Sequence, residues 1–521
     1  MHLTSIDVTI VAVYAVALFG LAQWVSRDRG GHEKTSADYF LASRSLPWWA
    51  IGASLIAANI SAEQIVGMAG SGYAIGLAIA SYEWMAALTL IIVGKWFLPI
   101  FLRNQIYTMP QFLEQRFGAR IRVLMAVFWL GLYIFVNLTS IIWLGSIAVN
   151  RVAGVDQTTA LIALGGFALL YQLWGGLRAV ALTDIVQVSL LVLGGLFVSG
   201  LTLAKIGAGA GILAGFATLV ARVPEHFHMI LTPDNPHYKE LPGLAVLIGG
   251  MWIANLSYWG CNQYIVQRAL AAKSINEAQK GVIFAAYLKL LMPVIIVLPG
   301  IAAVVLAPEL PRSDQAYPTM MQLLPPGIAG LVFAALIAAI VASTASKINS
   351  IATIFTLDIY NKRGKAHDER TLVRVGRIAA IVAIAIAIVA ARPLLGSFDQ
   401  AFQYIQEYTG FFTPGIVVIF VLGLFWKRAN EAGAMAGTIG SFVLSLALKA
   451  LWPELPFMNR MAVVFALALA IAIGVSLMRP APLHESNRIT VHDVSFRTSM
   501  SFNIGALGVV LALTALYSIW W

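Results

Sequence analysis

The sequence has few charges and almost no cysteine. Of its 521 residues only 11% are charged, and Cys261 is the single cysteine, so no disulfide can form within the chain. Hydrophobic residues make up 60% of the chain. Apolar runs of about 20 residues, each long enough to cross a bilayer, fill nearly the whole length. This composition excludes an ordinary soluble protein.

The formal net charge of +10 does not indicate a nucleic-acid partner, because the basic residues are scattered over short loops between apolar segments. We interpret them as topology signals. The sequence also lacks a Gly-rich nucleotide loop and a nucleophile–base pair. His226 and His228, in the segment 207–242, fit no metal-binding motif. We therefore predict that the protein is not an enzyme and that this segment is a solvated extracellular loop.

The apolar segments predict an all-α integral membrane protein with about fourteen transmembrane helices. Their expected positions are 6–24, 47–70, 75–102, 121–150, 158–176, 181–206, 243–267, 279–307, 327–358, 375–392, 400–426, 432–452, 460–478 and 501–520. The first segment lacks a small-residue cleavage site, so we expect a retained helix and not a signal peptide. Most of the 34 lysines and arginines fall in loops on one side. Because positive loops stay in the cytoplasm, both termini are predicted outside it, with the chain in the inner cell membrane.

The segment 57–84 is unusual because polar residues and glycines interrupt its apolar run. The sequence Asn-Ile-Ser-Ala-Glu-Gln at 59–64 is followed by several glycines and then by Tyr82, Glu83 and Trp84. Polar groups at this depth tend to face a bundle interior or a water-filled cavity. An interrupted apolar segment is also the best sequence pointer to a transporter's binding site. The alternative is a plain loop between two short helices.

Two lysines lie within expected spans at different depths. Lys289 falls about ten residues into its span, near the membrane midplane at a rise of about 1.5 Å per residue. It is too deep to reach water easily, so it needs a partner, and Glu83 is the natural one. Lys95 lies close to a cytoplasmic end, and we interpret it as an anchor that snorkels to the membrane surface.

Amides and aromatic rings recur at a comparable depth on other spans, at Asn255, Tyr258 and Gln406. An isolated polar residue in a span usually makes only a helix–helix hydrogen bond, but here amides, a carboxylate, a lysine and aromatics occur together. Without a cluster of positive charge, this set suits a neutral polyhydroxylated ligand such as a sugar. A cation would need carbonyl and hydroxyl oxygens, which are available around 57–60 and at Ser343.

Five motifs resemble, in order, those of sodium/solute symporters of the sodium–glucose cotransporter branch, and are most similar to bacterial sodium–galactose transporters. They are AANISAEQ at 57–64, SYEW at 81–84, GGLRAVALTDIVQ at 175–187, YWG at 258–260 and QYIQ at 403–406. The resemblance covers essentially the whole chain. It implies a LeuT-type fold in which two inverted five-helix repeats hold the substrate midway, beside discontinuous helices.

The resemblance also implies how the chain is divided. An extra helix and a cytoplasmic loop occupy 1–45, the first inverted repeat 46–206, an extracellular loop 207–242, the second repeat 243–428, and three further helices 429–521. The implied function is secondary active import of a neutral hexose by alternating access, coupled to sodium.

Carried over residue by residue, the resemblance implies three groups of site residues. The sugar ligands are Gln64, Glu83, Asn255, Lys289 and Gln406. The gate residues are Tyr258, which stacks on the sugar ring from the inner side, and Met68 and Tyr82, which help to close the outer side. The sodium ligands are the carbonyls of Ala57, Ile60 and Ala339 and the hydroxyl of Ser343, with Asp184 on the sodium path to the cytoplasm.

Three positions depart from the family pattern. Ala86 stands where a sugar-contacting serine is expected, and Ala342 replaces the first of two serines expected at the sodium site. Lys347 lies one helical turn from Ser343, where an apolar residue is expected. One hypothesis is that Lys347 pairs with Asp184 and partly substitutes for sodium, which would make the sugar transporter proton-coupled or cation-independent. The other is that Lys347 turns toward cytoplasmic water and sodium still binds.

An alternative of another class is a sugar sensor on the same scaffold. Such proteins usually carry a signalling domain, and the sequence gives no reason to expect one. A channel is a further alternative, but it would need a continuous polar stripe through the membrane and not one cluster at mid-depth.

Overall fold

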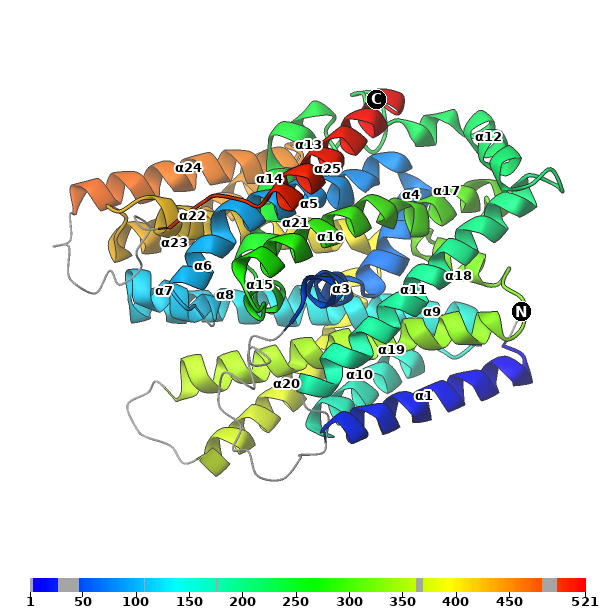
Figure 1. The fold of residues 1–521 in the computed structure, drawn as a ribbon, viewed down its shortest axis with the longest axis horizontal. Helices are drawn as coiled ribbons and strands as arrows, with labels where there is room; N and C mark the ends of the chain where they lie inside the picture. The colour runs from blue at the N-terminus through cyan, green and yellow to red at the C-terminus, as the bar shows by residue number, and fades with distance from the viewer. Residues whose placement is uncertain (1–2, 27–45, 107, 175–176, 362–368, 480–493) are drawn as a thin grey trace.

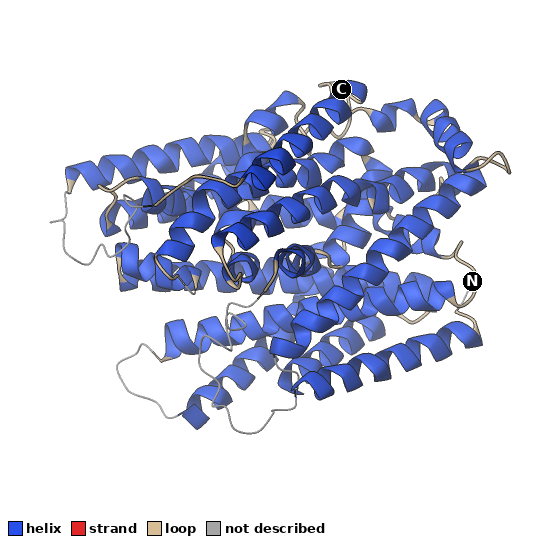
Figure 2. Cartoon of the chain, viewed as in Figure 1, coloured by secondary structure: helices blue, strands red, loops and turns tan. Residues whose placement is uncertain are grey.

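The computed structural model describes residues 3–26, 46–106, 108–174, 177–361, 369–479 and 494–521. Within these ranges the chain is helical, and Figure 2 shows helices joined by short loops without a strand. The one β-type contact in this part is an isolated bridge between Leu46 and Ala272. The all-α class predicted from the sequence is confirmed.

Nine helical segments of the described chain are long and apolar enough to cross a membrane, and two bent pairs bring the number to eleven if each pair is one span. The nine are Leu77–Arg103, Ala119–Ala153, Val186–Ile206, Ile275–Leu306, Ile328–Tyr360, Arg370–Leu395, Glu431–Leu451, Phe457–Met478 and Met500–Ile519. Two further helices, α1 (Ser5–Ser26) and α10 (Gln157–Trp174), lie where spans were expected. The multi-pass architecture is confirmed, whereas the number fourteen stays a prediction.

The polar run in the segment 57–84 coincides with a broken helix in the interior of the bundle (Figure 1). Helix α3 (Trp48–Asn59) ends at Ile60, whose ψ of 116° is extended, and the chain then resumes as the π-helical segment η2 (Glu63–Met68) and α4 (Ala69–Ala74). The two halves are bent by 68°. The last carbonyls of α3 have no partner within the helix, and such a break is tolerated at membrane depth only where protein or water covers it.

The expected span 243–267 is also broken. Helix α14 (Gly250–Leu256) continues into the π-helical turn η7 (Ser257–Cys261), and Asn262, with φ −86° and ψ 124°, separates this turn from α15 (Gln263–Leu270). The first helix of each expected repeat is therefore discontinuous, as the resemblance implied.

A third bend, of 46°, lies between α21 (Ala401–Thr409) and α22 (Thr413–Phe425) and was not expected. Pro414 occupies the first turn of α22. Proline is favoured there because its missing N–H belongs to a position that has no partner within the helix. The proline thus starts a new helix where the sequence pattern had indicated one continuous span.

The broken helix packs tightly on α16 (Ile275–Ile295). A Cβ atom added at Gly52 would lie 2.8 Å from the carbonyl oxygen of Gly281, so no larger residue fits at this crossing without a shift. Small residues let membrane helices approach closely. The crossing at Gly52 and Gly281 holds α16 against the helix that ends at the break.

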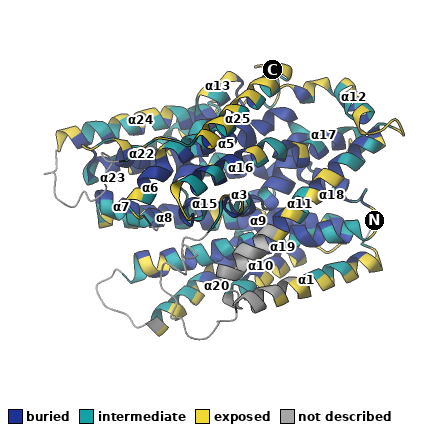
Figure 3. Ribbon diagram, in the orientation of Figure 1, coloured by how far each residue is buried: buried dark blue, intermediate teal, exposed yellow. Residues whose placement is uncertain are grey.

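Figure 3 shows that buried residues fill the interior, while exposed ones lie on the outer faces of helices such as α24 (Phe457–Met478) and α25 (Met500–Ile519).

A single carboxylate attaches α1 to α19 (Ile328–Thr353). Asp7 of α1 is 2% exposed and accepts hydrogen bonds from the backbone N–H groups of Gly327, at 2.7 Å, and Gly330, at 2.8 Å. These amides belong to the N-terminus of α19, where N–H groups have no partner within the helix and the dipole favours negative charge. Gly330 allows the contact, since a Cβ there would lie 2.6 Å from the Cα of Asp7.

The segment 207–242, predicted to be a solvated extracellular loop, is partly helical and partly docked on the bundle, and its place outside the cell stays a prediction. It contains helix α12 (Ile212–Arg222), and Phe227 is buried with its ring centroid 5.2 Å from that of Trp520 near the C-terminus. The neighbouring His226 lies with a ring nitrogen 3.1 Å from the carbonyl oxygen of Tyr73. Burial lowers the pKa of His226 below its usual value of 6.5. Apolar side chains within the segment explain its packing.

Candidate functional site

Two opposite charges lie buried in contact with each other. Lys289 projects from α16, and Glu83 lies in the first turn of α5 (Ser81–Ile92). The Lys289 Nζ atom is 2.5 Å from Glu83 Oε2, and the two side chains are only 1% and 4% exposed. The predicted pairing of these residues is confirmed. A buried ion pair is tolerated when further hydrogen bonds satisfy its remaining donors and acceptors.

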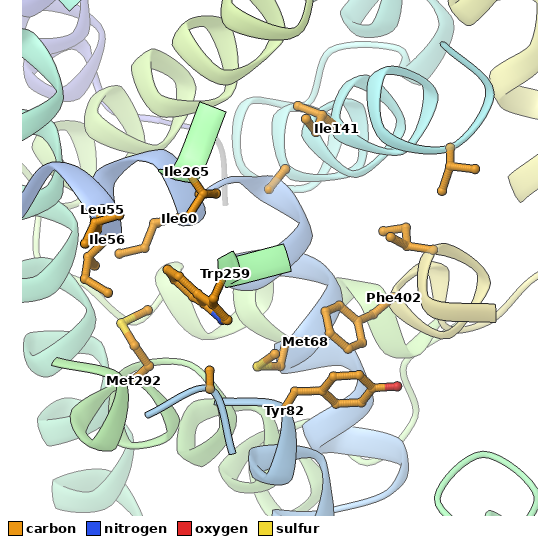
Figure 4. Close-up of a cluster of buried hydrophobic side chains, with 14 of the residues drawn as sticks. Leu55, Ile56, Ile60, Met68, Tyr82, Ile141, Trp259, Ile265, Met292 and Phe402 are labelled. Carbon is orange, nitrogen blue, oxygen red and sulfur yellow. The ribbon is translucent and has the colours of Figure 1, made fainter. Parts of the chain in front are cut away.

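Asn59 supplies one of these further bonds, because it is the last residue of α3 and its side chain reaches the pair. Its Oδ1 atom accepts a hydrogen bond from Lys289 Nζ. The same ammonium lies 5.1 Å from the ring centroid of Trp259, a distance suited to a cation–π contact. Figure 4 shows the Trp259 ring within a cluster of apolar side chains that includes Ile60 and Met68. The lysine is thus held by a carboxylate, an amide and an aromatic face.

Tyr258 extends this network toward α15. Its hydroxyl accepts hydrogen bonds from Asn59 Nδ2, at 3.0 Å, and from the hydroxyl of Tyr264, at 2.7 Å. Its ring meets that of Trp259 edge to face, with the centroids 5.1 Å apart. The tyrosine predicted as the inner gate is therefore fixed through its hydroxyl as well as its ring.

The other three predicted sugar ligands are engaged locally or lie further along the bundle. Gln64 is 8% exposed, and its Oε1 accepts a bond of 3.0 Å from Ser61 Oγ. Asn255 is 6% exposed and donates a bond of 3.1 Å to the carbonyl of Met251 in its own helix. Gln406 is partly buried on α21. Convergence of all five ligands on one cavity therefore stays a prediction.

The predicted outer gate residues lie together in the apolar interior. Met68 is 1% and Tyr82 is 7% exposed, and Figure 4 shows them next to Phe402 of α21. The Tyr82 ring packs edge to face on Phe402 with the centroids 5.1 Å apart. The Tyr82 hydroxyl is buried and has no hydrogen-bond partner among the described residues. An unpaired buried hydroxyl costs free energy, so this position favours a polar ligand or a second conformation.

A second polar region is a cavity at the break of α3. Its lining residues carry oxygen atoms, apolar surface and charge of both signs; they include Ala57, Asn59, Ser61, Glu63, Tyr258, Tyr264, Arg268, Ala342, Ser343, Ser346 and Lys347. Of the predicted sodium ligands, Ala57 and Ser343 line this cavity, while Ile60 and Ala339 are buried at 2% and 5% exposure. Carbonyl groups at the C-terminal end of a helix carry partial negative charge. The break therefore offers carbonyl and hydroxyl oxygens of the kind a sodium ion needs.

Lys347 is the unexpected group in this cavity, and it is 6% exposed. Its Nζ atom lies 3.8 Å from the ring centroid of Tyr264 and 4.9 Å from that of Tyr133. It interacts electrostatically with Glu63 of η2. The side chain of Asp184 lies outside the described part of the structure, so the hypothesis that it pairs with Lys347 stays untested.

The sequence analysis assigned no role to Glu63, Asn59 or Tyr264. Glu63 accepts a hydrogen bond of 2.6 Å from Ser140 Oγ, on α9 (Thr139–Ala153), and faces the cavity. A signal for it was present, because a lysine at the depth of Lys347 requires a carboxylate and Glu63 stands at the helix break. Tyr264 had no such signal, since its role depends on the turn at Asn262 that directs α15 toward the cavity.

Comparison with known proteins identifies the family. The model of the sodium:solute symporter family matches residues 39–440. A sodium/glucose cotransporter of Vibrio parahaemolyticus is 50% identical over 100% of this chain and 99% of its own length. Sodium/glucose cotransporter 1 of Ovis aries is 34% identical over 85% of this chain and 71% of its own, and sodium/myo-inositol cotransporter 2 of Sus scrofa is 34% identical over 84% and 69%.

Two solved structures share the fold. A substrate-bound, outward-open Na+-coupled sialic acid symporter is 24% identical and aligns with a TM-score of 0.78 over 92% of this chain and all of its own. Mhp1, a nucleobase-cation-symport-1 family transporter in a closed conformation with bromovinylhydantoin bound, is 14% identical and aligns with a TM-score of 0.55 over 89% and 100%. The LeuT-type fold is confirmed. The protein is a multi-pass membrane transporter and not an enzyme, and the chain belongs to the sodium:solute symporter family, whose coupling ion is sodium.

Proposed function

We propose that the solute imported with sodium is a neutral monosaccharide of hexose size. The observation that carries this proposal is the buried Glu83–Lys289 pair with Asn59 beside it, because the cluster offers both donors and acceptors without net charge. Sugar hydroxyls are donors and acceptors at once, so they suit such a mixed set. The names of the relatives support the same class, since glucose and myo-inositol are both neutral and polyhydroxylated.

Glu83 and Lys289 contact each other directly, so a sugar has to separate them in order to bind. The hydroxyls of the sugar then replace the lost contact, accepting from the ammonium and donating to the carboxylate. Gln64, Asn255 and Gln406 are proposed to complete the site with amide bonds after small changes in side-chain rotamer. Binding energy used to open an ion pair is available only to a ligand that satisfies both charges. This requirement gives the site its selectivity for polyhydroxylated molecules.

The proposed gates lie on either side of this cluster. Tyr258 covers the inner side with its ring, and its hydroxyl is held by Asn59 and Tyr264. Met68 and Tyr82, against Phe402, cover the outer side. Alternating access requires that one side opens while the other stays closed.

Sodium is proposed to bind at the break of α3. The carbonyls of Ala57, Ile60 and Ala339 and the hydroxyl of Ser343 would surround it, with exit toward the cytoplasm past Asp184. Asn59 lies between the two sites, since it lines the cavity and also accepts from Lys289. A sodium ion that orders the end of α3 would therefore also position an acceptor for the sugar site.

A second candidate function is sugar transport that uses protons or no ion. The observation that favours it is the presence of the Lys347 ammonium in the same cavity as Ser343, together with the missing hydroxyl at Ala342. A positive charge near the sodium site weakens sodium binding by repulsion.

The topology is proposed from the distribution of basic residues. The chain lies in the inner membrane with both termini on the side away from the cytoplasm. The two inverted repeats occupy 46–206 and 243–428. Cysteine accessibility at the two ends of the chain in intact cells tests the orientation, because Cys261, the single native cysteine, is buried.

Uptake by purified protein in liposomes tests the proposed function. Radiolabelled glucose and galactose are offered with an inward sodium gradient, with a potassium gradient of equal size, or with an inward proton gradient. We expect accumulation above equilibrium only with sodium. An acidic sugar of the same size should not compete, and competition by it would contradict a neutral substrate. Accumulation driven by protons alone would establish the second candidate. Lys95→Met serves as a control, because Lys95 contacts the Trp96 ring away from both sites.

A further inference from the structure

The cavity at the break of α3, here the cation cavity, is lined by two oppositely charged side chains, Lys347 and Glu63. Lys347 comes from α19 and Glu63 from η2, so the two charges reach the cavity from different helices. Lys347 is 6% exposed and far from either end of its 33-residue helical segment. A lysine at such a position needs partners that compensate its lost hydration.

The partners of Lys347 hold it in place from several elements. The rings of Tyr264 and Tyr133 lie 3.8 Å and 4.9 Å from its Nζ atom. Asn137 Oδ1 is a weaker neighbour at 3.5 Å. Aromatic faces attract cations strongly where water is excluded, yet they carry no net charge. Glu63 lines the same cavity, and its carboxylate interacts electrostatically with the ammonium.

Glu63, for its part, has the surroundings of a cation ligand. Its Oε1 atom accepts from Ser140, and its carboxylate faces the cavity, where Ser61 and Ser346 also supply hydroxyl groups. Carboxylate and hydroxyl oxygens are hard ligands, the type that alkali and alkaline-earth cations prefer. A carboxylate at membrane depth without a counter-charge would be strongly unfavourable. A proton or a positive charge must therefore compensate it. Of the two basic residues that line the cavity, Arg268 donates to Ser54 Oγ, and Lys347 lies over the Tyr264 ring.

We propose that Lys347 is a tethered cation that fills a latent monovalent-cation site at Glu63. The ammonium supplies the charge that a mobile sodium ion would otherwise supply, and it moves with the protein instead of crossing the membrane. The inference rests on the proposed cation cavity. It concerns Glu63 and not the oxygens of Ala57 and Ser343, so it adds a second position to that cavity. Removing the lysine charge creates a binding site for one more sodium ion.

Counting bound sodium tests the proposal directly. Binding of ²²Na⁺ to purified protein is measured to saturation at pH 7.0 without sugar, where Lys347 keeps its charge. Lys347→Met is expected to bind one more sodium ion per chain than the wild type. Lys347→Met combined with Glu63→Gln should return to the wild-type number. Lys95→Met, which removes a membrane lysine outside the cavity, should not change it. An unchanged number in folded Lys347→Met protein overturns the proposal.

A second variant keeps the test decisive if Lys347→Met does not fold. Glu63→Gln alone should leave the number of bound sodium ions unchanged, because Lys347 and not sodium fills this position in the wild type. Loss of one sodium ion in that variant overturns the proposal. Both measurements omit sugar, so they stay interpretable even if liposome uptake shows that the solute is not a hexose.

Discussion

Replacing Lys289 by methionine removes the counter-charge of Glu83, whose side chain is only 4% exposed. Breaking a buried ion pair by removing one partner costs about 3–5 kcal/mol, because the remaining charge stays desolvated and uncompensated. Asn59 also loses the donor at its Oδ1 atom. Methionine nearly fills the space of lysine, so the loss is mainly electrostatic. We expect a lower melting temperature in detergent and no measurable hexose binding by calorimetry.

The double variant Lys289→Met with Glu83→Gln separates stability from binding. With both charges removed, the melting temperature should return close to the wild-type value, since neutral residues often replace a buried pair without loss. Hexose binding should stay absent because both charged ligands are gone. Lys95→Met is the matched control and should change neither quantity. Hexose affinity within twofold of wild type in the single variant, or a double variant as unstable as the single one, would refute the reasoning.

Three further changes test other parts of the molecule. Tyr258→Phe removes the acceptor of two hydrogen bonds and leaves one donor of the Asn59 amide unpaired. Sugar binding should weaken by up to about 1–3 kcal/mol and sodium-driven uptake should fall with it; wild-type affinity would show that only the ring of Tyr258 contributes. Ala86→Ser places a hydroxyl in α5 three residues after Glu83 and should change the ranking of glucose and galactose in competition assays, since hydroxyl contacts discriminate strongly; an unchanged ranking would place the position outside the site. Because burial lowers the pKa of His226, the unfolded chain binds a proton below about pH 6.5 that the native chain does not, and the melting temperature should fall as the pH drops through this range. His226→Gln should make the melting temperature less dependent on pH; an equally steep fall in the variant would show that another group causes the dependence.

The all-α class and the broken helix followed from the sequence because lipid leaves few options. Apolar runs of span length have to be helices, and a polar run such as 59–64 inside one of them has to break or line a cavity. The Glu83–Lys289 pair followed from the same reasoning, since a lysine at mid-depth requires a carboxylate. These predictions depend only on the free-energy cost of placing polar and charged groups in lipid, which can be judged residue by residue from the sequence.

The details that the sequence did not reveal depend on the direction of side chains after the breaks. Tyr264 lies against Lys347 only because Asn262 is extended and turns α15 toward the cavity. The bend before α22 was missed because apolar residues continue on both sides of Pro414. The prolines and histidines of the segment 207–242 indicated a solvated loop, yet Phe227 packs against Trp520 and docks part of it near the C-terminus.

The attachment of α1 by Asp7 has a mechanical consequence. Hydrogen bonds of 2.7 Å and 2.8 Å break when the partners separate by about an ångström, so they limit how far α1 and the start of α19 can move apart while both bonds persist. Any rocking of α19 against the broken helix carries α1 with it. Val13 and Val16 on α1 are 62% and 73% exposed, which puts part of the moving surface in contact with acyl chains. A change in bilayer thickness would therefore act on α1 and, through Asp7, on α19, the helix that carries Ser343 and Lys347.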